Sequence, residues 1–210
     1  MAERIKSRPC VIGITGGIGS GKSRVSHCWA KKFNLPLVDL DQICRQLLEP
    51  GQSGWKALRS LLGPSFFTDQ VLDRKRLRQA LFDDSDLRHQ VDAALHPLAR
   101  QEMIACCRNL TRDHRMVLVE VPLLCEAGWQ ADFDRIVVVW AGLQTRCARV
   151  MRRDSVDGRE ALRAIESQMD LFEKVLEADH AIDNGGPWVL TYLQVIHLGK
   201  LLSARQKTGF

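Results

Sequence analysis

Lys22 and Ser23 close a glycine-rich stretch whose residue types and spacing suit the binding of phosphate groups. The stretch fits the pattern G-x-x-x-x-G-K-[ST] and reads Gly16, Gly17, Ile18, Gly19, Ser20, Gly21, Lys22 and Ser23. Glycines allow successive backbone N–H groups to converge on one anion, and the first turn of a helix adds its positive dipole end. Lys22 is expected to reach the β- and γ-phosphates of a nucleotide, and Ser23 to bind Mg²⁺. The alternative is a flexible glycine turn that ends in Lys-Ser by chance.

Asp39, Asp41 and Glu120 are the acidic residues that could complete a site for phosphoryl transfer. Such a reaction needs a carboxylate near the acceptor hydroxyl to take up its proton. Each of the three falls at or near the C-terminal end of an expected strand, where ligands bind in doubly wound sheets. Each could instead cap a helix, and Asp41 in particular could cap one that begins at Gln42.

The elements around these residues predict an α/β fold. Apolar runs, the longest of them rich in valine, indicate buried strands at 11–14, 35–41, 116–121, 135–140 and 180–184. A helix follows the glycine-rich stretch and ends before Asn34. Because strand, helix and strand follow one another, the connection is a crossover and the strands pair in parallel. A final helix has Pro187 near its first position.

Residues 42–115 interrupt this alternation with apolar residues at helical spacing. Asp73 is a plausible N-cap, and Pro97 is expected to kink or divide the helix that contains it. More than seventy helical residues between two sheet strands are too many for a simple connection. They predict a helical subdomain.

Residues 146–178 form a second unusual segment. Six of the eighteen residues from Arg146 to Arg163 are arginines. Asp157 and Glu160 resemble a capping box, which predicts a helix running to about residue 178. The arginines either form a solvated helix face or belong to a lid that closes over a nucleotide.

Composition restricts the function classes that fit. The chain has 210 residues, 45% hydrophobic and 26% charged, which suits one ordered domain. Its formal charge of +5 is spread without a long basic block, and aromatic residues are sparse, so a small polyphosphate fits better than nucleic acid. No signal peptide or membrane span is expected. Seven cysteines without C-x-x-C spacing, and histidines without zinc-site spacing, indicate a reduced cytoplasmic protein.

Several motifs, in the same order as in the family, make the chain resemble the dephospho-coenzyme A kinases. The phosphate-binding stretch alone is shared by many classes, whereas the combination of D-x-D, H-P and acidic-x-P-L-L is specific. The matching stretches are Ile12 to Ser23, Val38 to Asp41, Glu49 to Gly51, Leu72 to Arg74, His96-Pro97, Glu120 to Leu124 with Glu126 and Gly128, Arg153-Asp154, Gln168-Met169 and Ile182 to Asn184. Departures from the pattern at Arg24, at Ser155 to Asp157, at Asp170 and at Val175 to Glu177 bear on the expected lid contacts rather than on the reaction.

The resemblance implies a three-layer P-loop NTPase fold with a mostly parallel five-stranded sheet, an all-helical substrate-binding insertion and a helical lid. It implies a cytoplasmic transferase that uses ATP and Mg²⁺ to phosphorylate the ribose 3′-hydroxyl of dephospho-coenzyme A, the last step of coenzyme A synthesis. The protein would be a monomer or weak oligomer without nucleic-acid or membrane partners. The single domain, 1–210, would comprise a core at 9–41, 116–145 and 179–210, an acceptor subdomain at 42–115 and a lid at 146–178.

The resemblance also implies roles for individual residues. Asp41 would be the catalytic base, Lys22 would hold the β- and γ-phosphates, and Arg149 would stabilise the transferring phosphoryl group. Ser23 and Glu120 would lie at the metal. The nucleotide would also contact Gly17, Ile18, Gly19, Ser20, Gly21, Arg153 and Asn184. The acceptor side would comprise Asp39, Asp41, His96, Glu120, Pro122 and Leu123. His96 could instead be a core histidine beside a helix break.

Another P-loop kinase, acting on a nucleoside, a nucleotide or a small alcohol, is the main alternative. The large helical insertion favours a bulky acceptor such as dephospho-coenzyme A. A GTP-binding switch is disfavoured because the chain lacks N-K-x-D, and its D-x-x-G, at Asp183 to Gly186, follows the last expected strand.

Overall fold

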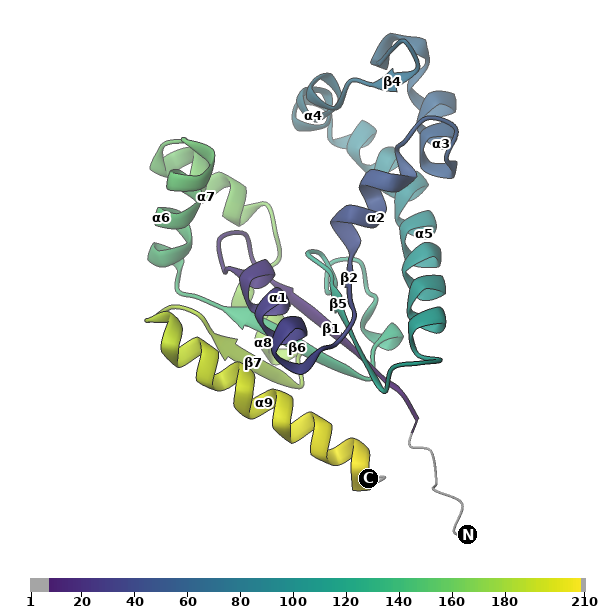
Figure 1. The fold of residues 1–210 in the computed structure, drawn as a ribbon. Coiled ribbons are helices and arrows are strands. Elements are labelled where there is room, and N and C mark those ends of the chain that lie inside the picture. The colour runs from purple at the N-terminus through teal and green to yellow at the C-terminus, as the bar shows by residue number, and fades with distance from the viewer. Residues whose placement is uncertain (1–7, 209–210) are drawn as a thin grey trace. The chain divides into compact units, whose positions relative to one another are not determined.

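The computed structural model describes residues 8–208, and their side chains as far as residue 204. The chain forms two compact units (Figure 1). One unit, the core unit, comprises the chain up to Val38 and the chain from Cys107 onward. The other unit, the helical unit, comprises Asp39–Cys106. Each unit has its own packing and is described separately.

A five-stranded sheet organises the core unit, and its strands lie in the order β2-β5-β1-β6-β7. Strand β1 pairs in parallel with β5 and β6, and β6 pairs in parallel with β7. This confirms the predicted α/β fold with a parallel five-stranded sheet. The strands are β1 (Cys10–Gly16), β2 (Leu37–Asp39), β5 (Met116–Glu120), β6 (Arg135–Trp140) and β7 (His180–Asp183).

Helices α1 (Lys22–Phe33) and α9 (Trp188–Thr208) pack together against one face of this sheet (Figure 1). Trp29 of α1 and Val195 of α9 are fully buried among strand residues that include Ile12. Helix α1 ends as predicted, because Asn34 takes a left-handed conformation with φ of 51° and caps it. This packing fixes the first turn of α1, and with it Lys22 and Ser23, against the end of β1.

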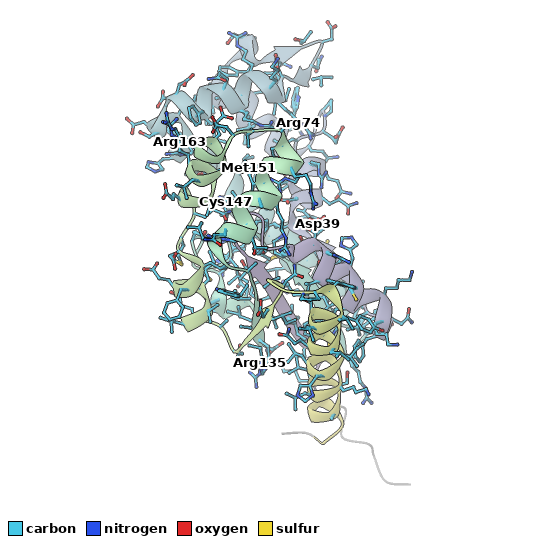
Figure 2. All side chains as sticks on the ribbon, turned by 90° about the vertical axis from the view of Figure 1, so that its left-hand side faces the viewer. Asp39, Arg74, Arg135, Cys147, Met151 and Arg163 are labelled. Carbon is cyan, nitrogen blue, oxygen red and sulfur yellow. The ribbon has the colours of Figure 1, made fainter. Side chains whose placement is uncertain are left out.

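The arginine-rich segment forms three helices, namely α6 (Leu143–Asp154), α7 (Gly158–Glu166) and α8 (Leu171–Leu176). Asp157 caps α7 by accepting from the Glu160 N–H at 2.8 Å, as the capping-box pattern predicts. The helix predicted to continue to residue 178 is broken after Glu166, and Asp170 caps its continuation through the Phe172 N–H. Figure 2 shows Cys147 and Met151 on α6 and Arg163 on α7.

The helical unit contains α2, α3, α4 and most of α5. Helix α5 continues through Pro97, so of the two expected effects of this residue, a kink or a division of the helix, the division does not occur. A buried cluster of Leu58, Leu72, Leu77 and Val91 holds the unit together. The elements are α2 (Leu40–Leu47), α3 (Ser53–Leu62), the 3₁₀ turn η1 (Pro64–Phe66), β3 (Phe67–Thr68), β4 (Val71–Leu72), α4 (Arg74–Asp83) and α5 (Ser85–Leu110). A second 3₁₀ turn, η2 (Gln130–Asp132), lies in the core unit.

A two-stranded hairpin, β3–β4, lies within the helical unit and was not predicted from the sequence. Asp69 and Gln70 form its turn with φ of 46° and 70°, the conformation that two-residue hairpin turns require. The indole N–H of Trp55 donates to the Gln70 carbonyl at 2.6 Å and fixes the turn to α3. Strands of two residues are too short to leave an alternating pattern in the sequence.

Candidate active site

The phosphate-binding stretch forms the connection between β1, which ends at Gly16, and α1, which begins at Lys22. Gly19 and Gly21 have φ of 79° and 84°, in the left-handed region that favours glycine. The loop therefore adopts a conformation that other residues at these two positions would strain. We refer to residues 16–23 as the phosphate loop.

Glu120, at the end of β5, joins three side chains at the start of α1. Its Oε1 accepts from Lys22 Nζ and from Ser23 Oγ, each at 2.5 Å, and its Oε2 accepts from Ser26 Oγ. The residue is only 3% exposed. Burial raises the pKa of Glu120, but the Lys22 charge and the three donors outweigh burial and leave its pKa below the ordinary value. Glu120 is therefore held as a carboxylate beside Lys22 and Ser23.

Side chains from other elements hold the outward-facing backbone groups of the phosphate loop. Arg149 of α6 donates from Nη1 to the carbonyls of Gly19 and Ser20, both at 3.2 Å, and from Nη2 to the carbonyl of Asn184 at 2.7 Å. The buried Asn184 amide also donates to the Ser20 carbonyl at 2.7 Å. These bonds hold the backbone of the loop at Gly19 and Ser20 in one conformation, as a loop that binds an anion through its N–H groups requires.

Gln168 and Arg146 also contact the loop. Gln168 Oε1 accepts from the Ile18 N–H at 2.9 Å. Arg146 is 6% exposed, and its guanidinium lies against Gly17, where a side chain on residue 17 would clash. Burial lowers the pKa of Arg146, and the charge of Asp170 opposes this effect. Within residues 8–208 the Arg146 Nε is buried without a hydrogen-bond partner.

Pro122 and Leu123 lie shortly after Glu120, in a loop that an ion pair between Glu126 and the buried Lys174 fastens to α8. Lys174 is fully buried, and its Nζ lies 2.6 Å from Glu126 Oε1 and 3.4 Å from the Pro122 carbonyl. The Thr15 hydroxyl donates to the same carbonyl at 3.2 Å. The structure thus brings Lys22, Ser23, Glu120 and Pro122 to one end of the core-unit sheet.

Asp39, Asp41 and His96 belong to the helical unit. Asp39 is the N-cap of α2, since its Oδ1 accepts from the N–H groups of Asp41 and Gln42 at 2.9 and 3.3 Å. Asp41 is therefore not the cap, and its exposed carboxylate lies in the first turn of α2. The His96 side chain is 42% exposed and lies 3.8 Å from Asp92, so it is not a core histidine.

The oxygen ligands at the phosphate loop suit Mg²⁺. This ion prefers oxygen ligands and is usually held by one or two protein groups together with phosphates and water. Ser23 Oγ and Glu120 Oε1 are adjacent, as such a site requires. Within residues 8–208 there is no group of three or more His, Cys, Asp or Glu placed to hold a metal by itself. Nor does the described part contain a helix both long and apolar enough to cross a membrane.

Three residues at this site had no role in the sequence-based prediction. Gln168 was noted only within a matching dipeptide, Ser26 lies one helical turn after Ser23, and Lys174 lies in the six-residue helix α8. Spacing from Ser23 could have suggested Ser26. The contacts of Gln168 and Lys174 join segments far apart in the sequence, which leaves no local signal. Arg153, predicted to contact nucleotide, pairs with Asp154 at 2.7 Å.

The family model described as dephospho-CoA kinase matches residues 10–188. A dephospho-CoA kinase of Desulfotalea psychrophila is 34% identical over 186 residues, which cover 88% of this chain and 94% of that protein. One of Shewanella oneidensis is 38% identical over 177 residues, covering 84% of this chain and 85% of that protein. The crystal structure of TT1252 from Thermus thermophilus is 31% identical in sequence. Its superposition covers 93% of this chain and 98% of the TT1252 chain, with a TM-score of 0.79. The chain therefore belongs to the dephospho-CoA kinase family, as its motifs predicted.

Proposed function

We propose that this dephospho-CoA kinase transfers the γ-phosphoryl group of ATP to the ribose 3′-hydroxyl of dephospho-coenzyme A, giving coenzyme A and ADP. The observation that carries the proposal is the buried contact of Glu120 with Lys22 and Ser23 at the phosphate loop. It holds a cation and a hydroxyl where a nucleoside triphosphate and its metal require them. Family membership supplies the acceptor.

Residues of the core unit would bind the donor. The backbone N–H groups of the phosphate loop would surround the phosphates, and Lys22 would exchange its contact with Glu120 for the β- and γ-oxygens. Ser23 and Glu120 would hold Mg²⁺, which when bound neutralises charge on the phosphate oxygens. Arg149, fixed at the loop by its bonds to Gly19 and Ser20, would stabilise the transferring group.

Asp41 would accept the proton of the 3′-hydroxyl as that oxygen attacks the γ-phosphorus and the bond to the β-phosphate oxygen breaks. Its place in the first turn of α2, where Asp39 already caps the helix, supports this role because the Asp41 carboxylate is not needed as a cap. Residues 42–115 would form the acceptor-binding part and residues 146–178 the lid. His96, Pro122 and Leu123 would lie on the acceptor side, and Arg153 and Asn184 on the nucleotide side.

A panel of acceptors with ATP and Mg²⁺ tests the proposal. Dephospho-coenzyme A, adenosine, a nucleoside monophosphate and water are compared by ADP release and by product mass. We expect dephospho-coenzyme A to have the highest kcat/KM, with the phosphate on its 3′ oxygen. Lys22→Met is the matched inactive control. Equal or faster turnover of adenosine or the monophosphate would reject the proposed acceptor.

A further inference from the structure

Two guanidinium groups, those of Arg45 and Arg74, lie at α2, the helix that carries Asp41. Arg45 follows Asp41 by four residues, so the two lie on the same face of the helix. The Nε of Arg45 donates to the Asp41 carbonyl at 3.1 Å. Arg74, the first residue of α4, donates from Nη2 to the Arg45 carbonyl at 3.4 Å. All three residues belong to the helical unit, so their arrangement is internal to it.

Both guanidinium groups retain donors that can reach a ligand. Arg45 is exposed, and within the described part of the chain its side chain uses only Nε. The Arg74 side chain is 47% exposed, and its Nη2 lies 3.6 Å from Glu49 Oε1. An exposed pair at that distance contributes little free energy. A phosphate group could therefore compete with Glu49 for Arg74.

The charged side chains along α2 change sign from its N-terminal to its C-terminal end. Asp39 and Asp41 place carboxylates at the N-terminal end of α2, and Arg45 and Arg74 place cations near its C-terminal end. An acceptor with a hydroxyl at one end and an anionic group at the other would be oriented by this pattern. Carboxylates at the first end repel the anionic group, and arginines at the second end bind it.

Dephospho-coenzyme A has these two ends on one sugar, because its 3′-hydroxyl and its 5′-diphosphate are attached to the same ribose. Residues four apart on a helix are separated by about 6 Å along the axis, which is the scale of that sugar. Arginine is suited to the other end because its planar fork matches two phosphate oxygens. We propose that Arg45 and Arg74 bind the 5′-diphosphate of the acceptor while Asp41 faces its 3′-hydroxyl. This inference rests on the proposed function.

Arg45→Gln and Arg74→Gln test the inference, with Arg78→Gln as the matched control. Arg78 is an exposed arginine of the same helix as Arg74. We expect each of the first two changes to raise the KM and Kd of dephospho-coenzyme A about 10- to 100-fold, the effect of losing a charged hydrogen bond. The kcat and the KM of ATP should stay within about threefold, because uniform binding is lost rather than transition-state stabilisation. Arg78→Gln should leave all four values unchanged.

A purely structural role for the two arginines would give a different result. It would lower kcat or the thermal midpoint and leave the KM of dephospho-coenzyme A unchanged, which would overturn the inference. Arg45→Lys and Arg74→Lys should recover part of the lost affinity, since charge returns without the fork. If the unmodified protein does not phosphorylate dephospho-coenzyme A, the proposed function fails. Calorimetric titration of that compound without ATP then still decides whether the two arginines bind it.

Discussion

The two units hold their charged side chains in opposite ways. In the core unit, Glu120 and Lys174 are buried, and each is bonded to an oppositely charged partner. In the helical unit, Arg74 and Glu49 form an exposed pair at 3.6 Å. The packing around a buried ion pair holds both side chains in one conformation. The side chains of an exposed pair readily replace each other's contact with water or a ligand. The charged groups beside the phosphate loop are therefore preassembled by the fold, whereas the exposed charges of the helical unit are accessible to solvent and to ligands.

This difference predicts which substitutions affect stability and which affect the reaction. A change in a buried charge of the core unit should alter the free energy of unfolding. A change at Asp41, Arg45 or Arg74, the exposed charges of the helical unit that are proposed to contact the acceptor, should alter kinetic constants and leave stability nearly constant. The following tests are ordered from the largest expected effect to the smallest.

Asp41→Asn should lower kcat by about 10²- to 10⁴-fold, because an amide cannot accept the proton of the acceptor hydroxyl. The free energy of unfolding should change by less than about 1 kcal/mol, as is usual at exposed positions. Steady-state kinetics and urea denaturation measure the two quantities. Asp86→Asn, at an exposed carboxylate of the same unit, is the control and should change neither. An unaltered kcat in Asp41→Asn would remove Asp41 from the chemistry.

Lys174→Met should lower the free energy of unfolding by about 1–3 kcal/mol, because it removes the contacts of the fully buried Lys174 ammonium with Glu126 and the Pro122 carbonyl. Adding Glu126→Gln to this variant should restore part of the loss, since the uncompensated charge is then removed. Glu49→Gln breaks the exposed pair of the helical unit and should cost about 0–1 kcal/mol. Denaturant titration gives all three values. Similar losses for Lys174→Met and Glu49→Gln would contradict the contrast between the units.

Glu120 should make the core unit sensitive to acid. Its pKa is lower in the folded protein than in the unfolded chain, so its contribution to stability is present at neutral pH. The contribution is lost as the pH falls from about 5 through the folded-state pKa. Glu120→Gln should therefore flatten the dependence of unfolding free energy on pH between about 5 and 3. Glu173→Gln, at an exposed position of α8, should leave it unchanged. An identical acid slope in both variants would show that Glu120 is not the group responsible.

The sequence predicted the parts of the site that depend on neighbouring residues. Lys22 and Ser23 were identified because the phosphate loop needs glycines and a helix start at fixed spacing. The strands β5 and β6 were identified because burial on both faces leaves continuous valine-rich runs. The cap of α7 at Asp157 was identified for the same local reason. Local rules could not decide whether Asp39 or Asp41 caps α2. The hydrogen bonds of Asp39 show that Asp39 is the cap.

Contacts between distant segments could not be predicted in this way. Gln168 binds the N–H of Ile18, and Lys174 pairs with Glu126, across 150 and 48 positions of the chain. The end of α7 at Glu166 also depends on distant contacts. Gln168 and Met169 form hydrogen bonds with Ile18 and Glu126 instead of continuing the helix. Such choices are made by tertiary packing, which overrides local helix propensity.

Two thiols, the half-buried Cys44 of the helical unit and the buried Cys125 of the core unit, give the test with the smallest expected effect. Burial raises the pKa of Cys44 to about 11, and the charges of Asp41 and Asp39 add to the shift. Burial likewise raises the pKa of Cys125 to about 11, with Glu177 as the largest charge effect. Asp41→Asn should lower the pKa of Cys44 and raise its alkylation rate at pH 8–9 by about two- to fivefold, since only the thiolate reacts. Glu177→Gln should have this effect on Cys125 alone. Peptide mass spectrometry measures alkylation at each thiol separately. Equal changes in the alkylation rates of both thiols in either variant would show that the substitution loosens the fold as a whole and does not act through the local charge.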